Sequence, residues 1–240
     1  MAIRSPYQFR DGARDGLPIA LGYLSVSFSI GIMAMNLGLP LFAAVLMSAT
    51  NLTSAGQVAG LAIIAAAGSW AELALSQLVI NSRYALMSLS LSQKLDDSFS
   101  LSRRLLAAFG ITDEIFVLAA GKEQPVGARY MCGLILIPWV GWTCGTLLGA
   151  AAGEILPAIV KAALGIAIYG MFIALIVPAA SRDRRVLIAV LIAAALSLII
   201  RYVPCFAFIT EGFAMILCAI LASVLMAALA PRRAAGEKQE

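Results

Sequence analysis

The sequence contains no histidine among its 240 residues. This absence excludes metal sites built on histidine, Ser-His-Asp triads and the membrane metalloproteases that need imidazole ligands. The four cysteines lie in apolar segments and form no Cys-x-x-Cys pair, so we interpret them as small packing residues and not as a disulfide framework. We therefore expect no enzyme, with no catalytic residue, no metal ligand and no cofactor.

Charged residues are also scarce, at 12% of the chain against roughly 25% in a typical soluble domain. Hydrophobic residues make up 62%, and the mean hydropathy is +0.95. A soluble chain of this composition would expose much apolar surface to water, so the predicted class is an all-α, polytopic α-helical integral membrane protein. The net charge of +4 lies in short clusters between apolar segments, which fits cytoplasmic loops and anionic lipid and disfavours nucleic acid as a partner.

The apolar sequence divides into about six to eight membrane segments. No charge occurs between Gly16 and Ala71, although one helix needs only about 20 residues to cross a bilayer. This run must hold two spans, or one span plus a broken or re-entrant piece, and the polar stretch "TNLTSAGQ" interrupts its second half. We expect segments at 17–36, 41–67, 69–91, 105–121, 130–153, 161–180, 186–203 and 206–230. Residues 1–16 are predicted to be a cytoplasmic tail, 17–230 a single transmembrane domain, and 231–240 a second cytoplasmic tail.

Basic residues cluster in four places, at the N-terminus and at 94–104, 182–185 and 232–238. If all four clusters are cytoplasmic, the chain crosses the membrane an even number of times between each pair. The first two intervals each contain three apolar segments, so one of each trio is expected to be discontinuous or re-entrant. The polar-interrupted segments 41–67 and 105–121 are the best candidates. The alternative is that one basic cluster lies outside, since the rule is a bias.

Ionisable residues inside membrane segments are costly, by about 2.5–3.5 kcal/mol on insertion scales, and are read first as functional. Arg83 lies deep in its segment and needs a carboxylate, which Asp113, Glu114 or a substrate can supply. A structural ion pair between two helices is the alternative. The other candidates are expected near segment ends or at the membrane surface: Glu72, Lys161, Arg201 and Glu211.

The stretch "AFGITDEIFVLAAG" combines an apolar segment with the residues of a helix start. Thr112 is a good N-cap, and Asp113 and Glu114 in the first turn suit the positive end of the helix dipole. We therefore predict a half-helix that begins inside the membrane, where unwound backbone is tolerated only beside a cavity or within protein. "TNLTSAGQ", with Gln57, is expected to be the matching break, and two such breaks are typical of a transporter's binding site. The alternative is a short helix capped at the membrane surface.

A glycine stripe marks the segment 130–153. Gly141, Gly145, Gly149 and Gly153 recur every four residues, which lets another helix approach closely. We expect this stripe to be architectural; the alternative is a surface for a small partner subunit.

Four stretches resemble the AzlC family of bacterial inner-membrane proteins, which is associated with the export of branched-chain amino acids. "FRDGARDGLPIALGY" is similar to the family's start, "TSAGQ" to its Ala-Gly-Ser-Gln break, "NSRYALMSLSL" to its Asn/Asp-x-Arg-His-x-Leu motif and "AFGITDEIFVLA" to its Phe-Gly-Thr-Asp-Glu-x-Phe motif. The resemblance covers about residues 9–205. Two departures bear on substrate or coupling: Tyr84 stands where the family has histidine, and the small residues after Thr53 are in an altered order.

The resemblance implies a secondary transporter in the bacterial inner membrane that exports small hydrophobic amino acids, with a small AzlD-like subunit as partner. A zwitterion needs a cation for its carboxylate and an anion for its ammonium group. The expected binding or coupling residues are therefore Arg83, Asp113, Glu114, Asn81, Gln57 and Thr112. One of the two acids can instead carry a coupling proton.

Two other classes compete with this reading. In a non-transport scaffold or assembly subunit, the charges would only pair helices. An intramembrane aspartyl protease would need two opposed aspartates, whereas Asp113 is the only deep one.

Overall fold

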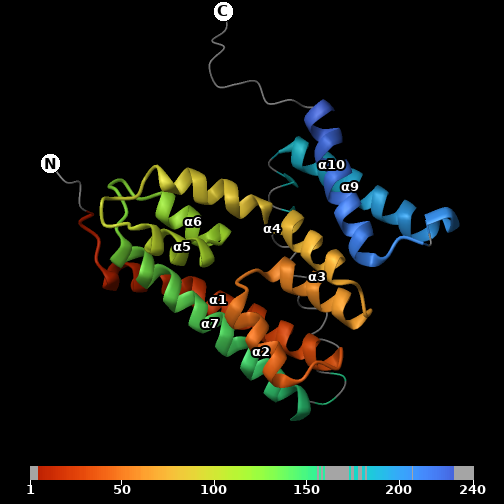
Figure 1. The fold of residues 1–240 in the computed structure, drawn as a ribbon, viewed down its shortest axis with the longest axis horizontal. Helices are drawn as coiled ribbons and strands as arrows, with labels where there is room; N and C mark the ends of the chain where they lie inside the picture. The colour runs from red at the N-terminus through yellow and green to blue at the C-terminus, as the bar shows by residue number, and fades with distance from the viewer. Residues whose placement is uncertain are drawn as a thin grey trace, which may run out of the picture. The chain divides into compact units, whose positions relative to one another are not determined.

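The computed structural model describes residues 5–155, 183–206 and 208–229, together with isolated positions between 157 and 181. Across these residues the chain is helical and contains no β-strand, which confirms the all-α fold (Figure 1). The elements are α1 (Phe9–Asn36), α2 (Leu41–Thr50), α3 (Ser54–Ala65), α4 (Trp70–Ser92), α5 (Leu101–Phe109), α6 (Asp113–Ala120), α7 (Ala128–Ile155), α9 (Arg184–Tyr202), the 3-10 turn η1 (Pro204–Phe206) and α10 (Glu211–Leu229). Four described helices are long and apolar enough to cross a membrane: α1, α7, α9 and α10.

The chain divides into two compact units. The first combines Met1–Leu61 with Ile80–Tyr169, and the second combines Ala62–Val79 with Gly170–Glu240. The predicted transporter domain over 17–230 and its two cytoplasmic tails stay predictions. The segment expected at 161–180, with Lys161, and the tail at 231–240 lie outside the described residues, apart from the isolated positions.

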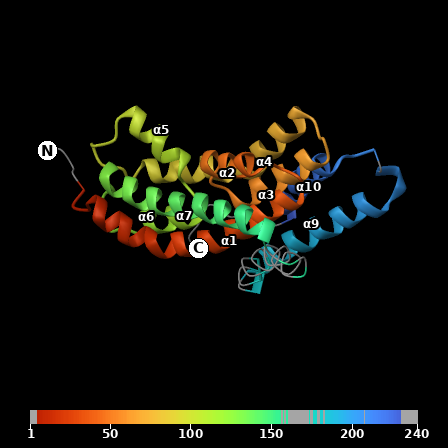
Figure 2. The same cartoon turned by 90° about the horizontal axis from the view of Figure 1, so that it is seen from below.

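Helices α1 and α7 pack side by side along their length and form the centre of the first unit (Figures 1 and 2). They run parallel, because Gly133 near the start of α7 lies against Phe9 and Gly149 near its end lies against Phe28. α1 begins at Phe9, two turns before the span expected from residue 17. Its start is fixed by a capping box, in which the backbone N–H of Gln8 donates to the Asp11 carboxylate at 2.8 Å.

The glycine stripe of α7 is the surface on which α1 lies. A Cβ atom at Gly141 would approach the Ala20 carbonyl oxygen to 2.6 Å, and one at Gly145 or Gly149 would overlap the α1 backbone. The architectural reading is therefore confirmed for these three glycines, whose face is covered by α1 and is not a surface for a partner. Gly153 lies outside the residues whose surroundings are described.

The apolar segment 105–121 starts and ends at the same end of the first unit. It consists of two short helices, α5 and α6, and the chain on either side of the pair is joined. Leu95 forms a parallel bridge with Val126, and the Lys94 ammonium donates to the Ala120 carbonyl at 2.6 Å. The backbone N–H of Ser5 donates to Asp96 at 2.7 Å, so the residues just before α1 lie at this same end.

The apolar segment 41–67 is broken into α2 and α3, as predicted. α1 and α7 start at the same end of the first unit, and the chain returns to that end after α5–α6. α4 has 23 residues, a length of about 35 Å, whereas α2 and α3 have 10 and 12 residues, or about 15 and 18 Å. α4 is thus longer than either α2 or α3, which together form one broken apolar segment.

In the second unit, α9 packs against α10, and Arg201 and Glu211 lie at helix ends as expected. The expectation that Glu72 faces the membrane surface is wrong, because only 3% of this residue is exposed. Its carboxylate accepts from the backbone N–H of Gly212 at 2.9 Å and from the Thr210 hydroxyl. Glu72 thus caps the N-terminus of α10, where the helix dipole favours an anion.

Candidate functional site

The break between α5 and α6 is built from local capping chemistry. α5 ends at Phe109, with Gly110 as its C-cap, and α6 starts after Thr112, whose hydroxyl accepts from the Ile115 N–H at 3.4 Å. Asp113 and Glu114 occupy the first turn of α6, at the positive end of its dipole. The predicted helix start with Thr112 as its N-cap is therefore confirmed.

The break between α2 and α3 uses the same cap. α2 ends at Thr50, and the Thr53 hydroxyl accepts from the Gly56 N–H at 3.3 Å as α3 begins. The break is thus Asn51–Thr53, and the rest of the polar stretch, including Gln57, lies in the first turn of α3. In each broken segment the helix therefore resumes at a buried threonine.

Each of these threonines also contacts a tyrosine from a long helix. The Tyr23 hydroxyl, on α1, is hydrogen-bonded to Thr112 at 2.7 Å and to the Glu114 carboxylate at 2.6 Å. The Tyr84 hydroxyl, on α4, donates to Thr53 at 3.4 Å. Tyr23 thus ties the second break firmly to α1, whereas the Tyr84 contact is close to the limit of a hydrogen bond.

Arg83 is paired with Asp113. Its Nη2 lies 3.0 Å from Oδ2 of Asp113, and the guanidinium carbon lies 5.1 Å from the centre of the Tyr84 ring. Both charged side chains are 48% exposed, so the pair can be reached from outside the protein. The sequence predicted that a carboxylate would meet Arg83, and the structure selects Asp113 because Glu114 is held by Tyr23.

The two breaks and α4 surround a cavity of about 150 Å³. Asn81 and Tyr84 line it from α4, and the remaining lining residues belong to the breaks and the helix ends beside them: Thr50, Asn51, Leu52, Thr53, Ala108, Phe109 and Ile111. At about 30 Å³ for each water, this is the volume of about five water molecules. The cavity can therefore hold a small polar group, such as the head of an amino acid.

Gln57 lies elsewhere, in a buried network beside α7. The side chain is 1% exposed; it accepts from Nε1 of Trp142 at 2.9 Å and donates to the Ser48 hydroxyl at 2.8 Å. Ser48 is in turn bonded to Thr146 at 2.6 Å. Of the six predicted site residues, Asn81 alone lines the cavity. Gln57 also lies apart from the Arg83–Asp113 pair, and its amide has the surroundings of a packing residue.

A comparison with protein families matches the part of the chain that contains both helix breaks. The model of the AzlC protein family matches residues 18–156, which is more than half of the chain. The chain belongs to the AzlC family. Inner membrane protein YgaZ of Escherichia coli is 30% identical over 197 residues, which is 79% of this chain and 80% of that protein. An uncharacterized membrane protein of Archaeoglobus fulgidus is 31% identical over 172 residues, 71% of this chain and 75% of the other. No solved structure matches the chain.

The part matched to the AzlC family contains both helix breaks, Arg83 and Asp113. The family and the membrane helices together indicate a role related to membrane transport. Sequence reasoning missed Tyr23 and Trp142, whose rings meet edge to face at 5.2 Å and link the second break to the Gln57 network. In a sequence this apolar, neither residue differs from an ordinary aromatic residue of a membrane helix.

Proposed function

We propose that this AzlC family protein is a secondary active transporter that exports small hydrophobic amino acids, with branched-chain amino acids as the main substrates. One observation carries the proposal: two opposite charges, Arg83 and Asp113, form a half-exposed pair at 3.0 Å, and Asp113 lies in the first turn of the helix that resumes after a break. Broken helices of this kind are typical of substrate sites in secondary transporters. The substrate class and the direction of transport come from the family resemblance.

An amino acid zwitterion matches the charges of this site. Its carboxylate can take the place of Asp113 against Arg83, while its ammonium group meets Asp113. One ion pair is then exchanged for two, so that no charge is left without a partner in the membrane. The N-termini of α3 and α6 contribute positive dipole ends, which also favour the substrate carboxylate.

The second acid is available for coupling. Glu114 is bound by the Tyr23 hydroxyl at 2.6 Å and takes no part in the Arg83 pair in this structure. We assign a coupling proton to one of the two acids, since a carboxylate that loses its partner during transport gains a proton readily in a poorly hydrated site. Thr112 and Asn81 keep their proposed part in binding or coupling, since Thr112 caps α6 and Asn81 lines the cavity.

The test is exchange of labelled leucine by the purified protein in liposomes, with and without a small AzlD-like subunit. We expect exchange by the unchanged protein and its loss by about 100-fold or more in Arg83→Ala. A double variant, Arg83→Asp with Asp113→Arg, restores an ion pair but not the substrate geometry, so it should stay inactive. The matched control is Lys122→Ala, which removes the 2.7 Å pair with Asp15 away from the breaks and should leave exchange near its normal rate.

The rival is a non-transport scaffold, and one feature favours it: Arg83 and Asp113 are already paired without any substrate. If the charges only join helices, the reversed pair should behave like the natural one in every assay. Recovery of full activity by the double variant would therefore indicate that the Arg83–Asp113 pair has only a structural role. Absence of exchange by the unchanged protein, with or without its partner subunit, would remove the transport proposal altogether.

A further inference from the structure

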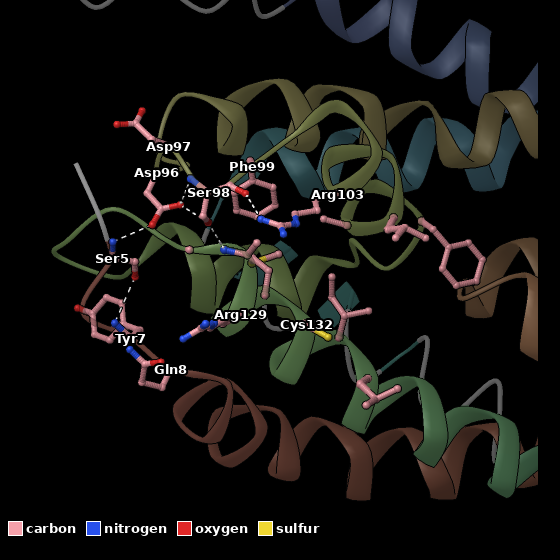
Figure 3. A pocket seen from close by; sticks show the side chains of 18 of the residues that line it. Ser5, Tyr7, Gln8, Asp96, Asp97, Ser98, Phe99, Arg103, Arg129 and Cys132 are labelled. Carbon is pink, nitrogen blue, oxygen red and sulfur yellow. Dashed lines mark hydrogen bonds between the residues drawn. The ribbon is translucent and has the colours of Figure 1, made fainter. Parts of the chain in front are cut away.

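A groove of about 1030 Å³ lies in the first unit between α5, α7 and the segments that precede them (Figure 3). Charged side chains lie at one end of it, with Asp97 and Arg103 from the α4–α5 loop and α5, and Arg129 from the start of α7. Toward the middle of α7 the lining becomes apolar, with Ile135, Leu136 and Trp139. The groove thus leads from a charged mouth toward the level of the helix breaks.

Phe109 lines both this groove and the small cavity between the helix breaks. It is the last residue of α5, and the break begins at the next residue, Gly110. A Cβ atom at Gly110 would overlap the side chain of Ile135, which itself lines the groove, so the backbone here is pressed against α7. The side chain of Phe109, which is 48% exposed, is the shared wall of the two spaces.

We propose that the groove is the vestibule through which a small zwitterion reaches the helix-break cavity, and that Phe109 is the partition it must pass. This inference rests on the proposed function for its substrate. The mouth carries both signs of charge, as a zwitterion requires, and the 94–104 basic cluster that forms part of it is predicted to be cytoplasmic. An exporter takes its substrate from that side.

A native cysteine reports on the vestibule. Cys132 lines the groove and is exposed. The first experiment uses a protein in which the other cysteines, Cys144, Cys205 and Cys218, are replaced by serine. A charged maleimide that cannot cross membranes is added to inside-out vesicles, whose outer face is the cytoplasmic one, and to right-side-out vesicles. We expect labelling of Cys132 in the inside-out vesicles only.

Each other result would overturn the vestibule. Labelling only by a membrane-permeant maleimide would mean that lipid chains or a helix of another subunit fill the groove. Labelling in right-side-out vesicles would place the mouth on the other face. Neither result depends on whether the protein moves leucine, so failure of the vestibule is separable from failure of the proposed function.

The second experiment tests the partition. Ile111 lines the small cavity and is 5% exposed, so Ile111→Cys added to the Cys132 protein gives one thiol on each side of Phe109. We expect Cys132 to react quickly and the cysteine at position 111 slowly. Phe109→Ala should raise the labelling rate at position 111 by about tenfold or more, because the barrier is then open continuously, and should leave the Cys132 rate unchanged.

Leu106→Ala is the matched control, since Leu106 lines the groove but not the small cavity. It should change neither rate. An unchanged rate at position 111 in Phe109→Ala would refute the partition, and a rise at both cysteines would show general loosening instead of an open passage. The rate at Cys132 within the same molecules shows whether each variant is folded.

Discussion

The two helix breaks share one capping device and differ in everything around it. At the α2–α3 break the neighbouring polar residue, Gln57, is 1% exposed and bonded to Trp142 and Ser48. At the α5–α6 break the neighbouring residue, Asp113, is 48% exposed and charged. The polar group beside the first break is buried and hydrogen-bonded, whereas the charged group beside the second break is accessible to a ligand.

The difference follows from the cost of changing partners. A buried, neutral amide network with its hydrogen bonds made is expensive to open, because each exposed donor or acceptor loses a partner without gaining water. A half-exposed ion pair can be approached by a ligand of matching charge, which can replace either member without leaving a charge unpaired. Substitutions at the two breaks should therefore separate stability from activity.

The largest effect is expected from Asp113→Asn. The neutral amide keeps the shape of the side chain but removes the anion, so leucine exchange should fall by about 100-fold or more. Thermal unfolding in detergent should change little, by less than about 1 kcal/mol, since the lost pair is half-exposed. A large loss of stability with normal exchange by the remaining folded protein would show that Asp113 stabilises the fold and does not serve transport.

Gln57→Leu should do the opposite. It leaves the indole N–H of Trp142 and the hydroxyl of Ser48 without their Gln57 partner, at a cost of about 2–4 kcal/mol in the free energy of unfolding. Exchange per folded molecule should persist, because Gln57 is buried and takes no part in the Arg83–Asp113 pair. Equal stability of the variant and the natural protein would show that the buried network is not what holds the first break.

Thr53→Val and Thr112→Val test whether the two caps are equivalent. Each removes a hydroxyl that accepts from the first turn of a half-helix, so each should lower the free energy of unfolding by about 1 kcal/mol. Serine in place of either threonine keeps the hydroxyl and should restore stability. A valine variant as stable as its serine counterpart would argue that packing, not capping, starts that helix.

The smallest effects are expected at the two tyrosines. Tyr23→Phe removes the 2.7 Å and 2.6 Å hydrogen bonds to Thr112 and Glu114, whereas Tyr84→Phe removes a 3.4 Å contact to Thr53. We expect a loss of about 1 kcal/mol for the first and less than about 0.5 kcal/mol for the second, measured by thermal unfolding. A larger effect at Tyr84 would mean that this ring is held tightly where it lines the cavity.

The features predicted correctly from the sequence are local ones or follow from charge. Thr112 could be predicted as an N-cap because the cap and its partner, the Ile115 N–H, lie within one turn. That a carboxylate would meet Arg83 followed from the cost of a lone charge in a membrane. The surroundings of Glu72 were predicted wrongly, because its partners, Thr210 and Gly212, lie about 140 residues further along the chain.

By itself, the sequence determined the membrane class, the glycine stripe and the two points at which helices break, because hydropathy, spacing and capping act over a few residues. Only the tertiary structure decided that Arg83 meets Asp113, that Tyr23 holds Glu114 and that Gln57 is buried against Trp142. These pairings join helices far apart in the chain. Which residues pair depends on how closely α1, α4 and α7 approach the breaks. This distance cannot be predicted from the residues of any one segment.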